Sequence, residues 1–245
     1  MTQDIKNTLI AIGDSFTEYP FTWANHLSKC LDMPLIKFSI AGASNKTILH
    51  NFYSNWFYNN LNFENCLVIY QSTSVTREDI HITEGARGHG FFKKDKVQKI
   101  VENKPDLIKD VFGKTYLLSG YRHFLSELPG FLSSLPDILE EVDPVRDLCF
   151  QINMLDKALK SNNNKFLFVL GLHNSHSAKQ LNFSDFPLSC ETVVYLKDGV
   201  AHGIDQYVND LNQVDNTNHP NIQGHKSIVN NLILPKLKEL NWTTK

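Results

Sequence analysis

The sequence predicts an α/β fold with a central parallel sheet of about five strands and helices on both faces. Short apolar runs recur along the chain, and segments with apolar residues at helical spacing separate them. This alternation is typical of parallel strands joined by crossover helices. The chain has 245 residues, of which 42% are hydrophobic and 20% are charged, so a single large domain with a substantial core is expected.

Five apolar runs are the expected strands. Each is short, and most contain β-branched or aromatic residues and end near glycine or polar residues. They cover residues 8–12, 35–40, 66–70, 165–170 and 192–196.

Four segments are the expected helices, because their apolar residues recur every three or four positions. They cover residues 21–31, 44–58, 144–159 and a final stretch from about 223. Ser44 is a suitable N-cap for the second, and Pro144 fits the first turn of the third. We expect Pro235 to kink or end a turn in the last helix.

About ninety residues separate the third expected strand from the fourth, which is more than one crossover helix needs. We expect an insertion of several short helices over about residues 77–141, with aromatic residues that pack together or cover a site. The whole chain, residues 1–245, is expected to form one domain that carries this insertion.

Composition argues against several classes of function. The net charge of −2 gives no electrostatic footprint for nucleic acid or an anionic membrane. No apolar run approaches the roughly 20 residues of a membrane span, and no segment resembles a secretory signal. The four cysteines show no Cys-x-x-Cys spacing, which argues against a zinc ribbon. We expect a cytoplasmic protein without metal or organic cofactor, with phage-type release left open.

The tripeptide Gly13-Asp14-Ser15 directly follows the first expected strand. A strand-to-helix turn presents its side chains at the carboxyl edge of a parallel sheet, where ligands bind in open α/β folds. Backbone N–H groups there can receive an anion, and a serine has the access that a nucleophile needs. The same residues can instead serve only to cap the next helix, so the tripeptide alone leaves both interpretations open.

A second motif, His219-Pro220-Asn221, lies just before the last expected helix. A histidine in that loop can accept the serine proton if the fold brings the two ends of the chain together. The alternative is a polar turn in which the asparagine and proline serve only to shape the loop. We expect His225, in the first part of the last helix, to be a structural or capping histidine rather than a second base.

Together the two motifs resemble the terminal sequence blocks of the SGNH (GDSL-like) hydrolase superfamily. The resemblance covers the core, about residues 7–76 and 144–240, and implies a flavodoxin-like three-layer sandwich. It implies that Ser15 attacks an ester carbonyl and that His219 is the general base. It also implies that the N–H groups of Ser15 and Gly42 form an oxyanion hole.

The first departure from the family pattern concerns the acid that orients the histidine. The family places an aspartate three residues before the histidine, where this chain has Asn216. Asp215, four residues before His219, is the expected orienting residue. A backbone carbonyl is the alternative, because the acid fixes the imidazole tautomer rather than accepting a proton.

The second departure follows the third strand. The family block Gly-x-Asn-Asp, whose asparagine donates to the oxyanion, is absent. A hydroxyl of Ser72, Thr73 or Ser74 is the expected replacement, or the backbone alone serves. Losing one such donor costs on the order of 10²–10³ in rate.

The remaining candidates are substrate contacts, with no metal site expected. They are Asp14, Asn45, Arg77 and His173. The leading hypothesis is a serine esterase that hydrolyses small acyl esters, above all O-acetyl groups on a carbohydrate. Two alternatives stay open: an O-acyltransferase that uses the same acyl-enzyme, and a catalytically degenerate fold that binds glycans or another protein.

Overall fold

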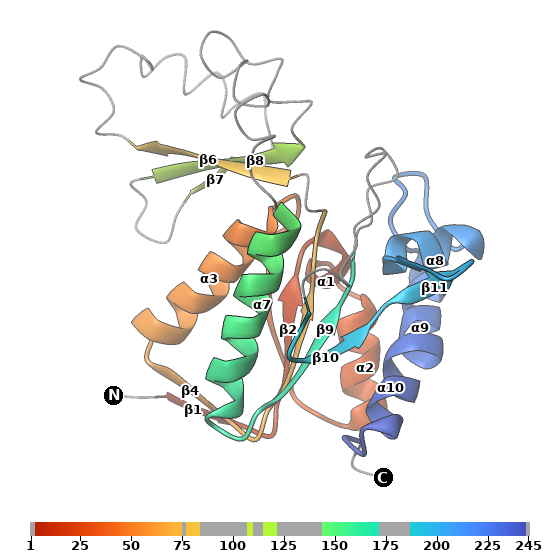
Figure 1. Cartoon of the computed structure of the whole chain (residues 1–245), viewed down its shortest axis with the longest axis horizontal. Coiled ribbons are helices and arrows are strands. Elements are labelled where there is room, and N and C mark those ends of the chain that lie inside the picture. Colours follow the sequence, from red (N-terminus) through yellow and green to blue (C-terminus); the bar gives the residue numbers. More distant parts are fainter. Residues whose placement is uncertain are drawn as a thin grey trace, which may run out of the picture.

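A five-stranded parallel sheet forms the centre of the protein (Figure 1). The computed structural model of the chain describes residues 3–74, 77–83, 107–109, 115–121, 144–171 and 187–243. The sheet has the order β10–β9–β5–β2–β3. Its strands are β2 (Leu9–Gly13), β3 (Leu35–Ser39), β5 (Leu67–Gln71), β9 (Lys165–Val169) and β10 (Glu191–Val193). Ranked along the chain, they lie in the order 2-1-3-4-5, which is the flavodoxin-like order. The predicted fold class is confirmed.

Helices cover both faces of this sheet (Figure 1). One face carries α3 (Asn45–Tyr58) and α7 (Pro144–Lys160). The other carries α2 (Trp23–Leu31), α8 (Ile204–Asp210), α9 (Ile222–Ile228) and α10 (Leu234–Glu239). The expected helices over residues 21–31, 44–58 and 144–159 are therefore present.

Each central strand contributes to two hydrophobic cores. In β2, Ile10 and Ile12 pack with α3 and α7, whereas Leu9 and Ala11 pack with α2 and the C-terminal helices. All four side chains are fully buried. Successive side chains of a strand point to opposite faces, so a strand covered on both faces must be apolar at every position. This requirement explains why the strands read as continuous apolar runs.

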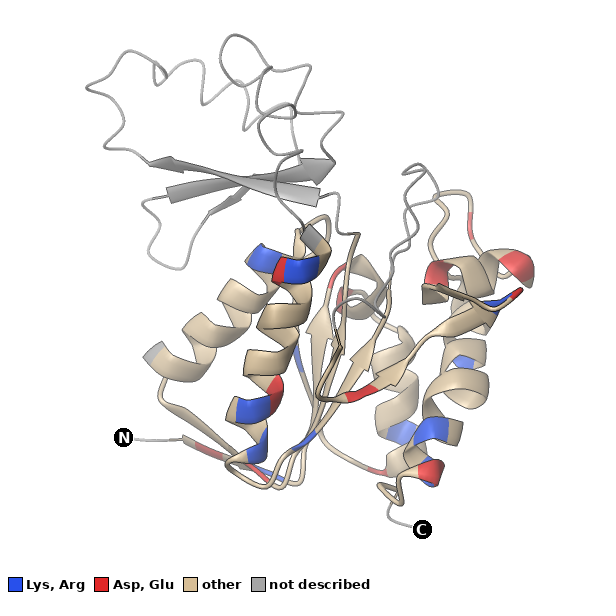
Figure 2. Ribbon diagram, viewed as in Figure 1, with Lys and Arg blue, Asp and Glu red and all other residues tan. Residues whose placement is uncertain are grey.

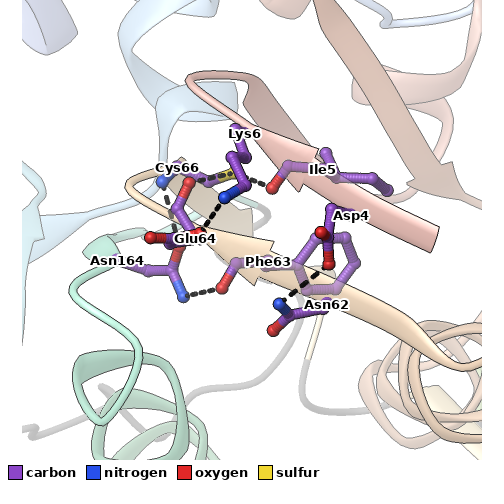
Figure 3. Close-up of polar contacts among 8 residues, drawn as sticks. All are labelled: Asp4, Ile5, Lys6, Asn62, Phe63, Glu64, Cys66 and Asn164. Carbon is purple, nitrogen blue, oxygen red and sulfur yellow. Dashed lines mark hydrogen bonds and ion pairs between the residues drawn. The ribbon is translucent and has the colours of Figure 1, made fainter. Parts of the chain in front are cut away.

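A short parallel pair, β1 (Gln3–Lys6) and β4 (Leu61–Glu64), directly precedes the sheet strands β2 and β5, and Figure 3 shows its polar contacts. The buried amide of Asn164 fastens it to the core: its Oδ1 accepts from the Cys66 N–H at 2.9 Å, and its Nδ2 donates to the Phe63 carbonyl at 2.9 Å. The Cys66 thiol donates to the Ile5 carbonyl at 3.4 Å. One asparagine thus connects the start of β9 with the start of β5.

Charged residues of both signs lie on α7 and α10 (Figure 2). On α7, Lys160 donates to the buried carboxylate of Asp156 at 2.8 Å, and the Ser189 hydroxyl donates to the same oxygen at 2.9 Å. This cluster ties α7 to the segment that leads into β10. Within the described ranges, no helix has the length and hydropathy needed to cross a bilayer.

The insertion contains strands where we expected helices. The described parts are β6 (Arg77–Thr83), β7 (Leu107–Lys109) and β8 (Thr115–Tyr121), which form an antiparallel sheet in the order β6–β8–β7. The segment Thr115–Tyr121 contains threonine, leucine and two tyrosines, a composition that suits a pleated, half-buried surface. The rest of the expected insertion lies outside the described residues.

The expected fifth strand over residues 192–196 is divided in two. β10 ends at Val193, and Tyr195 begins β11 (Tyr195–Lys197), which pairs antiparallel with β12 (Val200–His202). The connecting residues Asp198 and Gly199 both have positive φ, 53° and 78°. Two consecutive residues with positive φ are the signature of a tight hairpin turn, for which Asp-Gly is a favoured pair.

The C-terminal helix changes its winding before Pro235. A π-helical segment (Val229–Ile233) joins α9 to α10, and Pro235 lies in the first turn of α10. Proline has no N–H to donate and clashes with the preceding turn of a regular α-helix. A wider turn before it accommodates both effects, so the predicted irregularity at Pro235 is a change of helix type.

Candidate active site

Ser15 is the first residue of α1 (Ser15–Glu18), and only Asp14 separates it from the carboxyl end of β2, which lies between β5 and β3 in the sheet. Asp14 caps this helix, with its Oδ1 accepting from the Phe16 N–H at 3.0 Å. Asp14 is fully buried, and its Oδ2 has no hydrogen-bond partner among the described residues. Asp14 therefore holds the turn that presents Ser15, which is only 6% exposed.

His219 lies beside Ser15. Its Nε2 is 2.9 Å from the Ser15 Oγ, a hydrogen-bond distance between residues 204 positions apart. The imidazole also packs against the rings of Phe16 and Tyr19, with centroid separations of 5.4 and 6.3 Å. These two aromatic residues belong to the segment that carries Ser15, so one stretch of chain supplies both the serine and the aromatic rings that contact the imidazole.

The loop before α9 is a closed turn that fixes the position of His219. The Asp215 N–H donates to the His219 carbonyl at 2.8 Å, and Asn218 adopts a positive φ of 60°. The flanking residues Val214 and Pro220 form an isolated β-bridge. Asn221 then caps α9 by accepting from the Gly224 N–H at 2.9 Å. The histidine is thus held between a bridged turn and a capped helix.

The Asp215 carboxylate accepts hydrogen bonds from residues of this turn. It is connected to the imidazole ring through the hydroxyl of Thr217. Its Oδ1 accepts from the Thr217 hydroxyl at 2.6 Å, from the Thr217 N–H at 2.7 Å and from the His219 N–H at 3.1 Å. The hydroxyl of Thr217 is the main cause that lowers the pKa of the Asp215 carboxyl. The His219 Nδ1 lies 2.9 Å from the Thr217 Oγ1 and 3.2 Å from the Thr217 carbonyl oxygen. Sequence reasoning missed Thr217, although a hydroxyl residue between the acid and the base was visible.

Gly42 follows β3 with a φ of 77°, a conformation that glycine adopts without steric cost. The neighbouring Ala41 N–H donates to the Glu18 carboxylate at the end of α1. This contact links the glycine loop to the helix that carries Ser15.

The three hydroxyl residues after β5 are all buried. The Ser72 Oγ accepts from the Gly171 N–H at 3.2 Å, which joins the ends of β5 and β9. The Thr73 Oγ1 is buried and has no hydrogen-bond partner in the described part of the chain. Ser74 is also buried and completes the segment.

The side-chain amide of Asn45 is hydrogen-bonded through both its oxygen and its nitrogen and joins the start of α3 to the end of β5. Its Oδ1 accepts from the Tyr70 hydroxyl at 2.7 Å and from the Thr73 N–H at 2.9 Å, and its Nδ2 donates to the Thr73 carbonyl at 3.1 Å. Burial raises the pKa of the Tyr70 hydroxyl well above its ordinary value. These contacts give Asn45 a structural role beneath the edge where Ser15 lies.

A buried polar network supports α1 from below. The Thr17 hydroxyl donates to the Gln71 Oε1 at 2.8 Å and accepts from the Trp23 Nε1–H at 3.1 Å. A Cβ on Gly13 would lie 2.3 Å from the Thr17 Oγ1, so only glycine fits at the end of β2. Lys37 on β3 donates to the Tyr19 carbonyl at 2.9 Å, and burial lowers the pKa of its amine. The helix that carries Ser15 is thus fastened at both ends.

Two of the expected substrate contacts have no described side chain. Arg77 begins β6, but only its backbone is described, and His173 lies outside the described residues. Among the residues that the structure does describe, no three His, Cys, Asp or Glu side chains gather closely enough to hold a metal ion.

The chain matches no protein-family model and no curated protein. It is similar to a solved structure from Slackia heliotrinireducens named a "putative SGNH hydrolase", with 9% identity and a TM-score of 0.35. The match covers 92% of this chain and 94% of the other.

Proposed function

We propose that this protein is a serine hydrolase of the SGNH type that cleaves small acyl esters through an acyl-enzyme on Ser15. The observation that carries the proposal is the distance of 2.9 Å between the Ser15 Oγ and the His219 Nε2. A serine hydroxyl is a weak nucleophile until a neighbouring base accepts its proton. A neutral imidazole at hydrogen-bond distance is the base most often used for this step.

The reaction has two halves. The Ser15 Oγ attacks the ester carbonyl while its proton passes to the His219 Nε2, and the resulting imidazolium returns that proton to the departing alcohol oxygen. Water then attacks the acyl-enzyme with His219 again as base, which releases the acid and restores Ser15. No step needs a cofactor, because every proton is exchanged between Ser15, His219, water and the substrate.

The developing oxyanion needs hydrogen-bond donors near Ser15. The proposed donors are the backbone N–H groups of Ser15 and Gly42, with a hydroxyl of Ser72, Thr73 or Ser74 as the third, or the two N–H groups alone. Support comes from the positive φ of Gly42 and from the link between its loop and α1 through Glu18. The anionic charge forms only in the transition state, so such donors accelerate the chemical step.

The proposed substrates are O-acetyl esters of a carbohydrate. Tyr19 and Phe21 support this choice, because they follow Ser15 closely and are 52% and 68% exposed. Tyr19 also contacts the His219 ring, which places an aromatic surface beside the reacting atoms. Exposed aromatic side chains near the reacting atoms suit a ligand with both apolar and polar faces.

The test is hydrolysis of p-nitrophenyl acetate, butyrate and octanoate by the wild type and by Ser15→Ala. Ser161→Ala is the matched control, because Ser161 is an exposed loop serine whose hydroxyl donates only to the Ala158 carbonyl in the described structure. We expect Ser15→Ala to lose at least about 10³-fold in rate and Ser161→Ala to match the wild type. If acetate is the preferred ester, acetylated sugars are the substrates to assay next. Equal rates in the wild type and Ser15→Ala would refute the proposal.

A further inference from the structure

We infer that Thr217 is a positioning residue, whose hydroxyl connects the Asp215 carboxylate to the His219 ring and fixes the imidazole tautomer. The inference rests on the function proposed above for Ser15 and His219. It concerns a residue that neither motif contains and that lies between the acid and the base in the loop before α9.

Counting protons at Thr217 decides the direction of its two hydrogen bonds. Its Oγ1 lies 2.6 Å from the Asp215 Oδ1 and 2.9 Å from the His219 Nδ1. A carboxylate accepts hydrogen bonds but donates none, and its lowered pKa keeps Asp215 ionised at neutral pH. The single hydroxyl proton of Thr217 must therefore point to Asp215.

The imidazole must then supply the proton of the second contact. Because the Thr217 Oγ1 turns a lone pair toward the ring, the His219 Nδ1 carries hydrogen and donates. A neutral imidazole with hydrogen on Nδ1 has a bare Nε2. That nitrogen is the one placed 2.9 Å from the Ser15 Oγ, so the tautomer selected by Thr217 is the one that can accept the serine proton.

Asp215 does not reach the ring directly because the turn uses its carboxylate. The same Oδ1 accepts from the N–H groups of Thr217 and His219, at 2.7 and 3.1 Å. Its negative charge is carried to the ring through the polarised hydroxyl of Thr217, and this charge favours the imidazolium that forms during attack. No proton moves along this path: Nδ1 keeps its hydrogen and Thr217 keeps its own.

The Thr217 carbonyl oxygen, 3.2 Å from Nδ1, is a second and longer acceptor for the same hydrogen. Removing the hydroxyl therefore weakens the preference for one tautomer without abolishing it. We expect a partial loss of activity, about tenfold, rather than the loss expected at Ser15.

Three variants test the inference. Thr217→Val removes the hydroxyl and keeps the shape of the side chain, whereas Thr217→Ser keeps the hydroxyl. Asn216→Ala is the matched control, because Asn216 is an exposed residue of the same turn. Thr217 is also exposed, so all three variants are expected to fold, and thermal unfolding checks this.

The first measurement is ¹⁵N NMR of the histidine ring nitrogens at pH 8, where an ordinary imidazole is neutral. We expect hydrogen on the His219 Nδ1 in the wild type, Thr217→Ser and Asn216→Ala, and a shift toward a mixture of tautomers in Thr217→Val. The second measurement is ester hydrolysis, with kcat about tenfold lower in Thr217→Val, KM little changed, and Thr217→Ser within about threefold of the wild type.

An unchanged tautomer in Thr217→Val, or hydrogen on Nε2 in the wild type, would overturn the inference. So would a loss of activity in Thr217→Ser as large as in Thr217→Val. The ring-nitrogen measurement needs no substrate, so it tests Thr217 even if the wild type cleaves no ester. Failure of the proposed function and failure of this inference are therefore separate outcomes.

Discussion

The Nε2 of His219 lies 2.9 Å from the Oγ of Ser15, although Ser15 follows β2 near the start of the chain and His219 precedes α9 near its end. The sheet order explains this proximity. β2 lies inside the sheet between β5 and β3, and α9 packs on the same face as α2, which follows Ser15. The turn after β2 and the turn before α9 therefore meet at one edge of the sheet, where parallel α/β folds place their ligands.

Replacing the proposed base removes the proton acceptor without disturbing the core. We expect His219→Gln to lower kcat/KM for p-nitrophenyl acetate by at least about 10³-fold. His26→Gln is the control, because His26 lies on α2, where its ring contacts Cys30 at 3.8 Å. Circular dichroism should give the same helix content for all three proteins. A His219→Gln variant with wild-type kcat/KM would show that His219 is not the base.

The network beneath Ser15 depends on one hydroxyl. Thr17→Val leaves the Trp23 Nε1–H and the Gln71 Oε1 buried without the partner they have now, at a cost of about 3 kcal/mol in the free energy of unfolding. Thr17→Ser keeps both hydrogen bonds and loses only a methyl group, for about 1 kcal/mol. Urea denaturation measures both, and equal losses would contradict the role given to the hydroxyl.

His225 makes stability depend on pH. The residue is 8% exposed, and burial, followed by the positive charges of His219 and Lys37, lowers its pKa to about 4; the Asp215 carboxylate opposes this shift. In the unfolded chain the pKa is about 6.5, so between these values the unfolded state binds more protons and stability falls as the pH falls. The stabilisation is complete above about pH 6.5 and is lost toward pH 4.

The test compares the wild type with His225→Gln in urea at pH 7 and pH 4. Between these conditions, the wild type should lose about 3 kcal/mol more than the variant in the free energy of unfolding. The same pH dependence in both proteins would show that His225 is not the residue responsible.

Close packing at the ends of β5 and β9 leaves no room for a side chain at Gly171. A Cβ there would lie 1.8 Å from the Ser72 carbonyl oxygen, which is backbone and cannot move aside easily. We expect Gly171→Ala to lower the free energy of unfolding by about 3 kcal/mol or more. Gly199→Ala, at a positive φ with open space around it, should cost about 1 kcal/mol from backbone strain alone. Equal losses in thermal or urea unfolding would contradict this distinction.

Much of the fold could be predicted because the sheet is buried on both faces. Strands such as β2 and β5 must be apolar throughout and end at glycine or polar residues, so they stand out as short runs. The division at residue 194 is not evident from the apolar run, because it depends on β11 pairing with β12 across the tight turn at Asp198 and Gly199. The strand β6 could not be predicted because its partner β8 lies far along the chain, and periodicity does not reveal such a pairing.

The site was predictable in its residues and less so in its contacts. Ser15 and His219 belong to motifs whose positions relative to the strands can be read directly. The amide of Asn45 and the hydroxyl of Thr217 could not be placed, because their partners depend on how loops fold. The four-residue spacing from Asp215 to His219 is accommodated by a turn with Asn218 at positive φ, a conformation that spacing alone does not reveal.

The most direct measurement is labelling of the protein with a fluorophosphonate, followed by mass spectrometry of its peptides. If Ser15 and His219 form a reactive pair, the Ser15 Oγ displaces fluoride, so the wild type should carry one adduct on the peptide that contains Ser15. The adduct should be absent in Ser15→Ala and should form far more slowly in His219→Gln. A wild type without an adduct on that peptide, or one labelled equally fast in His219→Gln, would contradict the proposed role of the pair.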